Sequence, residues 1–319
     1  MRLLCSSLAG LVLAATSLQC SRKSDAPTTT PEADTAPAGA TKPNKDDEKI
    51  VVTGLSTPES VVHDSFADVY LVANIAGSPS EKDGNGFISK IAPSGEVLEL
   101  RFIQGGNEGT ELHAPKGIAL ADDATIVVAD IDTLRFFDRE TGAPREQIVI
   151  PGSTFLNDVV VFDDRTVLVT DTGVQMEDGK LVPTGTDAVY QVTRDGTVTP
   201  ILQDPELGNP NGIALLDDGA IRVVTFGSGQ VFDIRDGKHF VYDTTSPGQL
   251  DGLVVIDERT IWASSWTTRE IVRWQDEQWS VVLGEVHSPA DFSVDRLRSR
   301  LLVPLFTENE FWIVPIELE

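Results

Sequence analysis

The chain has little cysteine, few basic residues and one long apolar run, which lies at its N-terminus. Both cysteines, Cys5 and Cys20, fall in the first 20 residues, so no disulfide framework can hold the rest of the chain together. Only 25 residues are Lys or Arg, against 50 Asp or Glu, which gives a net charge of −25. Such a charge repels phosphate backbones and anionic headgroups, so we expect no nucleic-acid partner. Hydrophobic residues make up 40% of the chain, enough for a packed core.

The apolar run has the features of an export signal. It extends from Leu3 to Leu18 behind a basic residue and is shorter than the ~20 residues of a membrane-spanning helix. We predict a signal peptide over residues 1–19, of the bacterial lipoprotein type, with lipid attachment at Cys20. An ordinary signal cleaved near Ala15 or Ser17 is the alternative. The lipid would be the only contact with the membrane. The protein would be an exported periplasmic or cell-surface lipoprotein, anchored to the outer membrane.

The segment after the signal predicts a spacer. Residues 21–49 contain no aromatic residue and no Val, Ile or Leu, but much Ala, Thr, Pro, Asp and Lys. Such a segment cannot bury enough apolar surface to offset the entropy lost on ordering. We therefore expect a flexible linker over residues 20–49 and a folded domain over residues 50–319.

The folded part contains a sixfold repeat. From Ile50 onward, short runs rich in Val, Ile and Phe are separated by turn residues, the pattern of an all-β chain. A three-residue motif followed by two apolar strands recurs every 39 to 57 residues, the range of propeller blades. The six copies are Pro58-Glu59-Ser60, Pro115-Lys116-Gly117, Leu156-Asn157-Asp158, Pro210-Asn211-Gly212, Leu250-Asp251-Gly252 and Pro289-Ala290-Asp291. The sequence therefore predicts a six-bladed β-propeller.

The C-terminus predicts how the ring closes. After Pro304 only one further strand can form, around Phe311 to Ile316, so the last blade would lack its fourth strand and leave an edge exposed. The run Ile50 to Val52 has no other partner. We expect this N-terminal strand to join the last blade.

The middle residues of the six motifs, here called the motif residues, predict a metal site. In a propeller blade the first strand follows the channel and the second returns antiparallel, so these residues should share one face around the channel mouth. Four of them offer oxygen and together carry a charge of −2: Glu59, Asn157, Asn211 and Asp251. Oxygen donors with positions left for water suit a hard divalent cation. Ca²⁺ is the expected occupant, with Zn²⁺, Mn²⁺ or Mg²⁺ as alternatives. The competing interpretation is that Asn-Gly and Asp-Gly serve only as turns.

Further side chains are candidates for the pocket around this site. Asp171 ends a second strand and should lie just outside the ring, and Trp266 directly follows another second-strand end. His113 and His287 each lie three residues before a motif residue and could reach the mouth as an auxiliary base, or remain solvated loop residues.

The motif residue of the second copy, Lys116, is the one cation expected in the ring. It could form a salt bridge with Asp130 or Asp132, or bind a substrate anion.

The quoted motifs resemble the gluconolactonase/regucalcin family, also called senescence marker protein-like and related to diisopropylfluorophosphatase. The resemblance covers residues 50–319 and rests on the order Glu59, Asn157, Asn211, Asp251 within their motifs. It implies that these four residues hold a catalytic divalent metal, and that the protein hydrolyses a lactone or a related ester or phosphotriester. Sugar-lactone members have an arginine two residues before the first asparagine. Here Phe155 stands there, which implies a less polar substrate.

The expected function is therefore metal-dependent hydrolysis of a lactone or related ester by a monomeric protein that acts on a small molecule. Asp251 is the first candidate for the base that deprotonates water, and Glu59 is the second. A non-enzymatic module that binds calcium for stability and presents its face to a protein or glycan is the alternative, because propellers host both roles.

Overall fold

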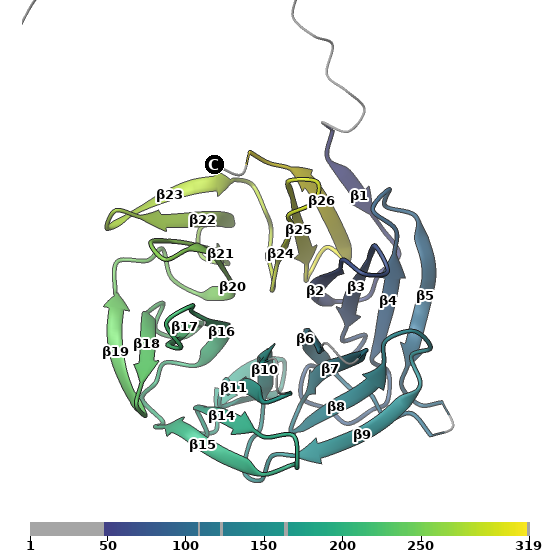
Figure 1. The fold of residues 1–319 in the computed structure, drawn as a ribbon, viewed down its shortest axis with the longest axis horizontal. Helices are drawn as coiled ribbons and strands as arrows, with labels where there is room; N and C mark the ends of the chain where they lie inside the picture. Colours follow the sequence, from purple (N-terminus) through teal and green to yellow (C-terminus); the bar gives the residue numbers. More distant parts are fainter. Residues whose placement is uncertain (1–47, 108, 122–123, 163–164, 318–319) are drawn as a thin grey trace, which may run out of the picture. The chain divides into compact units, whose positions relative to one another are not determined.

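Six four-stranded antiparallel sheets surround a common centre in the structure, a computed structural model (Figure 1). It describes residues 48–107, 109–121, 124–162 and 165–317. The predicted signal peptide, most of the predicted linker and Cys20 lie outside these residues. The described chain forms strands and turns and no α-helix, which confirms the all-β propeller. Accordingly, no helix in these segments has the length and apolar character needed to cross a bilayer.

The four strands of each blade are listed here from the channel outward. Blade one contains β2 (Pro58–Asp64), β3 (Val69–Asn74), β4 (Phe87–Ile91) and β5 (Val97–Gln104), and blade two contains β6 (Pro115–Ala121), β7 (Thr125–Asp130), β8 (Thr133–Asp138) and β9 (Pro144–Val149). Blade three contains β10 (Leu156–Val161), β11 (Val167–Asp171), β14 (Ala188–Val192) and β15 (Val198–Gln203), and blade four contains β16 (Pro210–Leu215), β17 (Ile221–Thr225), β18 (Val231–Arg235) and β19 (Lys238–Asp243). Blade five contains β20 (Leu250–Asp257), β21 (Thr260–Ser265), β22 (Glu270–Gln275) and β23 (Gln278–Leu283), and blade six contains β24 (Ser293–Asp295), β25 (Arg300–Leu305), β26 (Glu310–Pro315) and β1 (Ile50–Val52). A separate hairpin, β12 (Val174–Glu177) and β13 (Lys180–Pro183), is inserted in blade three.

The core lies between adjacent blades. One cluster joins Val127 and Phe136 of blade two to Leu156, Val169 and Tyr190 of blade three, and similar clusters join other neighbours. The middle strands are buried on both faces, which explains why they are nearly continuous apolar runs in the sequence.

The N-terminal strand closes the ring as predicted. Ile50, Val51 and Val52 of β1 pair antiparallel with Ile313, Trp312 and Phe311 of β26, and this strand is the outermost of blade six (Figure 1). The edge that blade six would otherwise expose is therefore covered by the other end of the chain.

Closure by β1 gives a test of stability. The Val52 side chain is 3% exposed and packs in a cluster with Tyr70, Leu302 and Phe311, whereas Val51 on the opposite face is 41% exposed. We expect Val52→Asp to lower the free energy of unfolding by about 3 kcal/mol or more, because it buries an unpaired carboxylate. Val51→Asp, the matched control, should change it by less than ~0.5 kcal/mol. Equal effects in denaturant unfolding would show that β1 does not hold the ring.

The inner hairpins open with an equivalent residue pair in all six blades, and in the first five a bulge follows where the motif lies. The pairs that open the inner hairpins are Pro58–Asn74, Pro115–Asp130, Leu156–Asp171, Pro210–Thr225, Leu250–Ser265 and, as an isolated bridge, Pro289–Leu305. In the first five blades the regular pairing shifts directly after this pair and resumes beyond the motif residue. A bulge turns the unpaired side chain out of the regular alternation, so the motif residues lie at the same level of the channel.

Candidate active site

One cavity contains all four predicted oxygen donors. It has a volume of about 190 Å³ and lies at the motif end of the inner strands. Its lining residues are Glu59, Ile75, Pro79, Lys116, Phe155, Asn157, Thr172, Val174, Met176, Leu181, Asn211, Phe226, Asp251, Trp266 and Phe306. We call it the central cavity, and we call Glu59, Asn157, Asn211 and Asp251 the oxygen ring.

Hydrogen bonds within their own blades hold the side chains of Asn157 and Asp251 in the oxygen ring. The Asn157 amide nitrogen donates to Thr172 Oγ1 at 2.9 Å, and the Thr172 hydroxyl donates to the carbonyl of Pro210 at 2.8 Å. The Trp266 indole N–H donates to Asp251 Oδ2 at 2.8 Å. Thr172 and Trp266 each directly follow the end of a second strand, so the hairpin geometry delivers both the ring residue and its support.

Three oxygen atoms of the ring have no hydrogen-bond partner among the described residues. Glu59 Oε2, Asn211 Oδ1 and Asp251 Oδ1 are buried and accept no hydrogen bond. The nitrogen of the Asn157 amide is held by Thr172, which leaves its oxygen as the group available to a ligand. Buried oxygens without donors are costly, and a cation would satisfy them together. The donor set, two carboxylates and two amides, suits a hard cation such as Ca²⁺.

No three His, Cys, Asp or Glu side chains come together as a metal cluster in the part of the chain that the structure describes. The oxygen ring contains only two such residues, so a cation there would depend on the two asparagine amides for half of its protein ligands. Zinc favours nitrogen and sulfur donors, and the ring offers neither.

Burial dominates the electrostatics of the ring. It raises the pKa of Glu59 well above its ordinary value; Asp251 and Asp158 raise it further, whereas Lys116 lowers it. Burial likewise raises the pKa of Asp251 to about 7, an effect that the hydrogen bond from Trp266 opposes. Without a cation, the cavity therefore favours protonated carboxyl groups near neutral pH.

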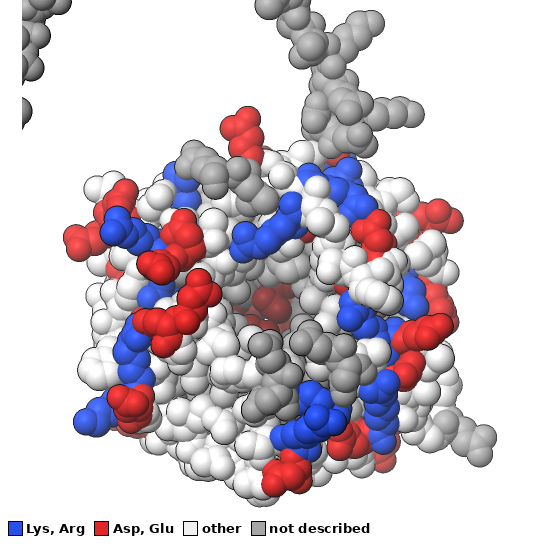
Figure 2. Space-filling model, viewed as in Figure 1, with Lys and Arg blue, Asp and Glu red and all other residues white. Residues whose placement is uncertain are grey.

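Two more acids lie in the channel, and sequence reasoning did not assign them a role in the site. Asp158 accepts backbone N–H bonds from Val159 at 2.7 Å and from Ile213 of the next blade at 2.8 Å, and burial raises its pKa to about 7. Burial also raises the pKa of Asp291, as do Asp158, Glu59 and Asp251. Acidic atoms are visible deep in the central opening of Figure 2. Their position in the repeat could have identified both acids, because each directly follows a motif residue.

Lys116 lines the cavity, but the predicted salt bridge with Asp130 or Asp132 is wrong. Its ammonium donates to the carbonyls of Pro79 at 3.0 Å and Ala114 at 3.2 Å. It also lies 4.1 Å from the centre of the Phe155 ring. Burial lowers its pKa to about 8, and the charge of Glu59 opposes this shift.

Asp130 and Asp132 have other cationic partners. Asp130 Oδ2 accepts from Arg135 Nε, and Asp132 Oδ2 accepts from Lys82 Nζ at 2.6 Å. Arg135 of β8, and not Lys116 of β6, therefore forms the ion pair with Asp130.

Three of the predicted pocket residues do not line the central cavity. Asp171 accepts backbone N–H bonds from Thr154 at 3.2 Å and Phe155 at 2.9 Å, which ties down the loop before the motif. His113 Nδ1 accepts from the Gly84 N–H at 3.0 Å, and the side chain of His287 is exposed. These residues were placed by chain distance alone, which does not show where a loop side chain points.

Aromatic residues form one wall of the cavity. The Trp266 ring lies 5.5 Å from Phe226 and 5.4 Å from Phe306, both edge to face. Trp266 and Phe155 were predicted at the pocket, whereas Phe226 and Phe306 were missed. Both missed residues directly follow a second-strand end, as Trp266 does, so the register of the repeat was the signal that could have found them.

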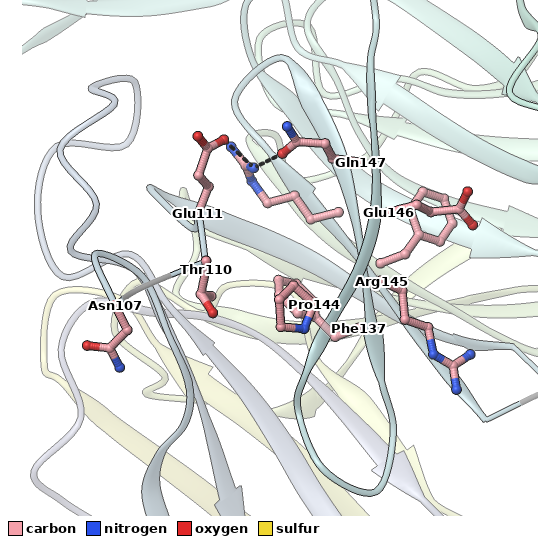
Figure 3. A pocket seen from close by; sticks show the side chains of 11 residues that line it. Asn107, Thr110, Glu111, Phe137, Pro144, Arg145, Glu146 and Gln147 are labelled. Atoms are coloured by element: carbon pink, nitrogen blue, oxygen red, sulfur yellow. Dashed lines mark hydrogen bonds and ion pairs between the residues drawn. The ribbon is translucent and has the colours of Figure 1, made fainter.

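A second cavity, on the outer part of blade two, is a weaker candidate. Its volume is about 440 Å³, and residues of the β5–β6 connection, β8 and β9 line it (Figure 3). Glu111 and Gln147 both accept hydrogen bonds from Arg135 there, at 3.1 and 2.6 Å (Figure 3). The Arg135 guanidinium in this second cavity is thus already paired within the protein, whereas the central cavity contains oxygen atoms without hydrogen-bond donors.

The fold and the site define a class, a six-bladed propeller with a ring of side-chain oxygens in its channel. A family model described as the SMP-30/gluconolactonase/LRE-like region matches residues 92–294. The chain therefore belongs to the SMP-30/gluconolactonase/LRE-like family, which supports a lactone hydrolase. A comparison with curated protein sequences finds no significant match.

Solved structures share the fold at low identity. A structural-genomics target named as a candidate gluconolactonase superimposes with a TM-score of 0.61 and 18% identity, over 85% of this chain and 94% of that chain. A gluconolactonase from Xanthomonas campestris gives 0.56 and 17%, over 84% and 98%. A streptogramin B lyase gives 0.58 and 15%, over 85% and 98%. Because structures named as gluconolactonases and a lyase share this fold, the fold alone does not decide the chemistry.

Proposed function

We propose that this protein is a divalent-cation-dependent hydrolase that opens a lactone or a related ester in the central cavity. The observation that carries the proposal is the set of three buried oxygen atoms, from Glu59, Asn211 and Asp251, that lack hydrogen-bond donors in the described structure. Membership of the SMP-30/gluconolactonase/LRE-like family supports the type of substrate.

The oxygen ring would hold the cation. When bound, a divalent cation polarises a carbonyl oxygen and lowers the pKa of a water ligand. Trp266 fixes Oδ2 of Asp251, whereas Oδ1 faces the cavity; this oxygen has two lone pairs, one for the cation and one to accept a proton from the attacking water. The water oxygen forms a bond to the carbonyl carbon, the ester C–O bond breaks, and Asp251 returns the proton to the leaving oxygen. The products are a carboxylic acid and a hydroxyl group.

Glu59 is the alternative base, and Lys116 balances charge in the cavity. Glu59 is the second candidate for the base, because its buried oxygen is equally without a donor. The ammonium of Lys116 is held in place by two backbone carbonyls and offsets part of the negative charge of the cavity.

Hydrolysis of a substrate panel tests the proposal. The protein would be assayed on lactones, aryl esters and phosphotriesters after chelation and after Ca²⁺, Mg²⁺, Mn²⁺ or Zn²⁺ is restored. We expect lactone or ester turnover with Ca²⁺ and at least a ~100-fold loss after chelation. Tight cation binding without turnover of any substrate would instead favour a calcium-stabilised binding module. Equal turnover after chelation would exclude the cation from the reaction.

A further inference from the structure

The hairpin inserted in blade three has one apolar face directed at the central cavity. In its register Met176 is opposite Leu181, and both line the cavity together with Val174. Gln175 belongs to the alternate set of positions, does not line the cavity and is exposed. Side chains alternate between the two faces of a strand pair, so the hairpin presents Met176 and Leu181 to the cavity and Gln175 to solvent.

A hydrogen bond to blade one holds this hairpin in place. The Met176 N–H donates to Ser80 Oγ at 3.0 Å, and Ser80 belongs to the β3–β4 connection of blade one. The neighbouring Pro79 carbonyl accepts from Lys116 at 3.0 Å. The hairpin of blade three therefore reaches the loop of blade one that also supports the cavity.

The cavity is divided by polarity. Its polar lining residues are the oxygen ring, Lys116 and Thr172. Its nine other lining residues are all apolar: Ile75, Pro79, Phe155, Val174, Met176, Leu181, Phe226, Trp266 and Phe306. Leu181 is 45% exposed, so much of its side-chain surface remains open to solvent.

We propose that the substrate carries an apolar alkyl or aryl group, bound between the inner face of the β12–β13 hairpin and the Phe226–Trp266–Phe306 aromatic wall. The proposal rests on the proposed function and names its substrate class. A polyhydroxylated ring would leave its hydroxyl groups unpaired against this lining, which is costly. An apolar group would cover Leu181 and the aromatic faces and remove them from water.

The cavity volume limits the size of this group. The volume of about 190 Å³ is close to that of an apolar cavity of ~150 Å³ that accommodates benzene, and below the ~300–1,000 Å³ typical of drug-sized ligands. A small ring with a short apolar group therefore fits beneath the hairpin as it stands.

Binding of ketone analogues tests the proposal without requiring turnover. Cyclopentanones with alkyl substituents of increasing length have the ring carbonyl of a lactone but no ester bond. Calorimetric titration into the full, Ca²⁺-loaded chain should show affinity rising about fourfold per added methylene until the cavity is full. The change in heat capacity on binding should become more negative with each added methylene. A hydroxylated cyclopentanone should bind at least tenfold more weakly than its alkyl counterpart.

Variants on the two faces of the hairpin provide the matched comparison. Leu181→Asp should reduce the chain-length dependence to less than twofold per methylene, whereas Gln175→Asp, with the same added charge on the outer face, should retain it. Leu181→Ala gives a version without added charge, and thermal melting checks that each variant folds. Equal behaviour of the two Asp variants, or affinity independent of chain length, would overturn the proposal. Chain-length-dependent binding without hydrolysis of any ester would contradict the hydrolase proposal and leave the apolar site standing.

Discussion

Replacement of Asp251 by Asn should reduce ester turnover about 100- to 10,000-fold, the range typical of losing a general base. Asp251 is 5% exposed, with Oδ2 bound to the Trp266 indole and Oδ1 buried without a donor. An amide has only one oxygen, which cannot serve both Trp266 and the cavity. We therefore expect weaker cation binding in addition to the loss of the base.

The assay separates these two losses. Turnover would be measured at increasing Ca²⁺ until it no longer rises, with cation binding followed by calorimetry. Asp257→Asn is the control, because Asp257 lies at the other end of the same strand, β20, and is exposed. Turnover of the Asp251 variant that reaches the wild-type value at saturating Ca²⁺ would rule Asp251 out as the base and make Glu59 the next candidate.

Addition of Ca²⁺ should stabilise the fold, and by more at higher pH. Four carboxyl groups of the channel have raised pKa values: Glu59, Asp291, and Asp158 and Asp251, the last two at about 7. A cation that binds only the folded state at ~1,000 times its Kd adds ~4 kcal/mol, or about 10 °C in Tm for a domain of this size. The chelated protein is the reference for this shift.

The sign of the pH dependence follows from the raised pKa values. Without a cation, the folded protein binds more protons than the unfolded chain between the unfolded pKa values of Asp and Glu, ~4, and the folded values near 7. The contribution of Asp158 and Asp251 is therefore full below ~pH 4 and is lost as the pH rises through about 7, and the raised pKa values of Glu59 and Asp291 act in the same direction. Deprotonated carboxylates are also the form that binds Ca²⁺, so the Tm difference between loaded and chelated protein should grow from pH 5 to pH 8.

The difference between the two Tm curves is the quantity to measure, because other acids act in the opposite direction. The hydrogen bonds from Arg139 and from the backbone at Ala67, for example, lower the pKa of Asp64 despite its burial. Their contribution is the same with and without Ca²⁺ and cancels. Asn211→Leu should abolish the Ca²⁺ shift, whereas Asp218→Asn, at an exposed turn, should preserve it. A shift of the same size in both variants would place the cation outside the oxygen ring.

The repeat could be predicted from the sequence because it depends on local patterns. Apolar runs, turn residues and a nearly constant distance from each motif to the end of its second strand determine each hairpin. In the structure Pro58 lies opposite Asn74 and Leu156 opposite Asp171. The closing strand was also predictable, because Ile50 to Val52 had no other partner and blade six had an open edge.

The inserted hairpin was missed although its signal was present. Asp178-Gly179 stands between Val174-Gln175-Met176 and Leu181-Val182, and an Asp-Gly pair between alternating residues is a strong hairpin signal. The extra length of the third repeat, between the Asn157 and Asn211 motifs, was not interpreted as an additional hairpin. That it lines the cavity could not have been predicted, since this depends on contacts between residues far apart in the chain, such as the hydrogen bond from Met176 to Ser80.

The sequence by itself determined the ring of blades and which residue types stand at its mouth, because strand period and turn chemistry act between near neighbours. Only the tertiary structure decided which polar groups find partners. Asp130 pairs with Arg135 and not with Lys116, and Asp171 accepts hydrogen bonds from backbone N–H groups. Asp251, in contrast, has one oxygen without a donor. Such choices depend on distances between blades, and a hydrogen bond forms with the donor that comes closest in space, whatever its position along the chain.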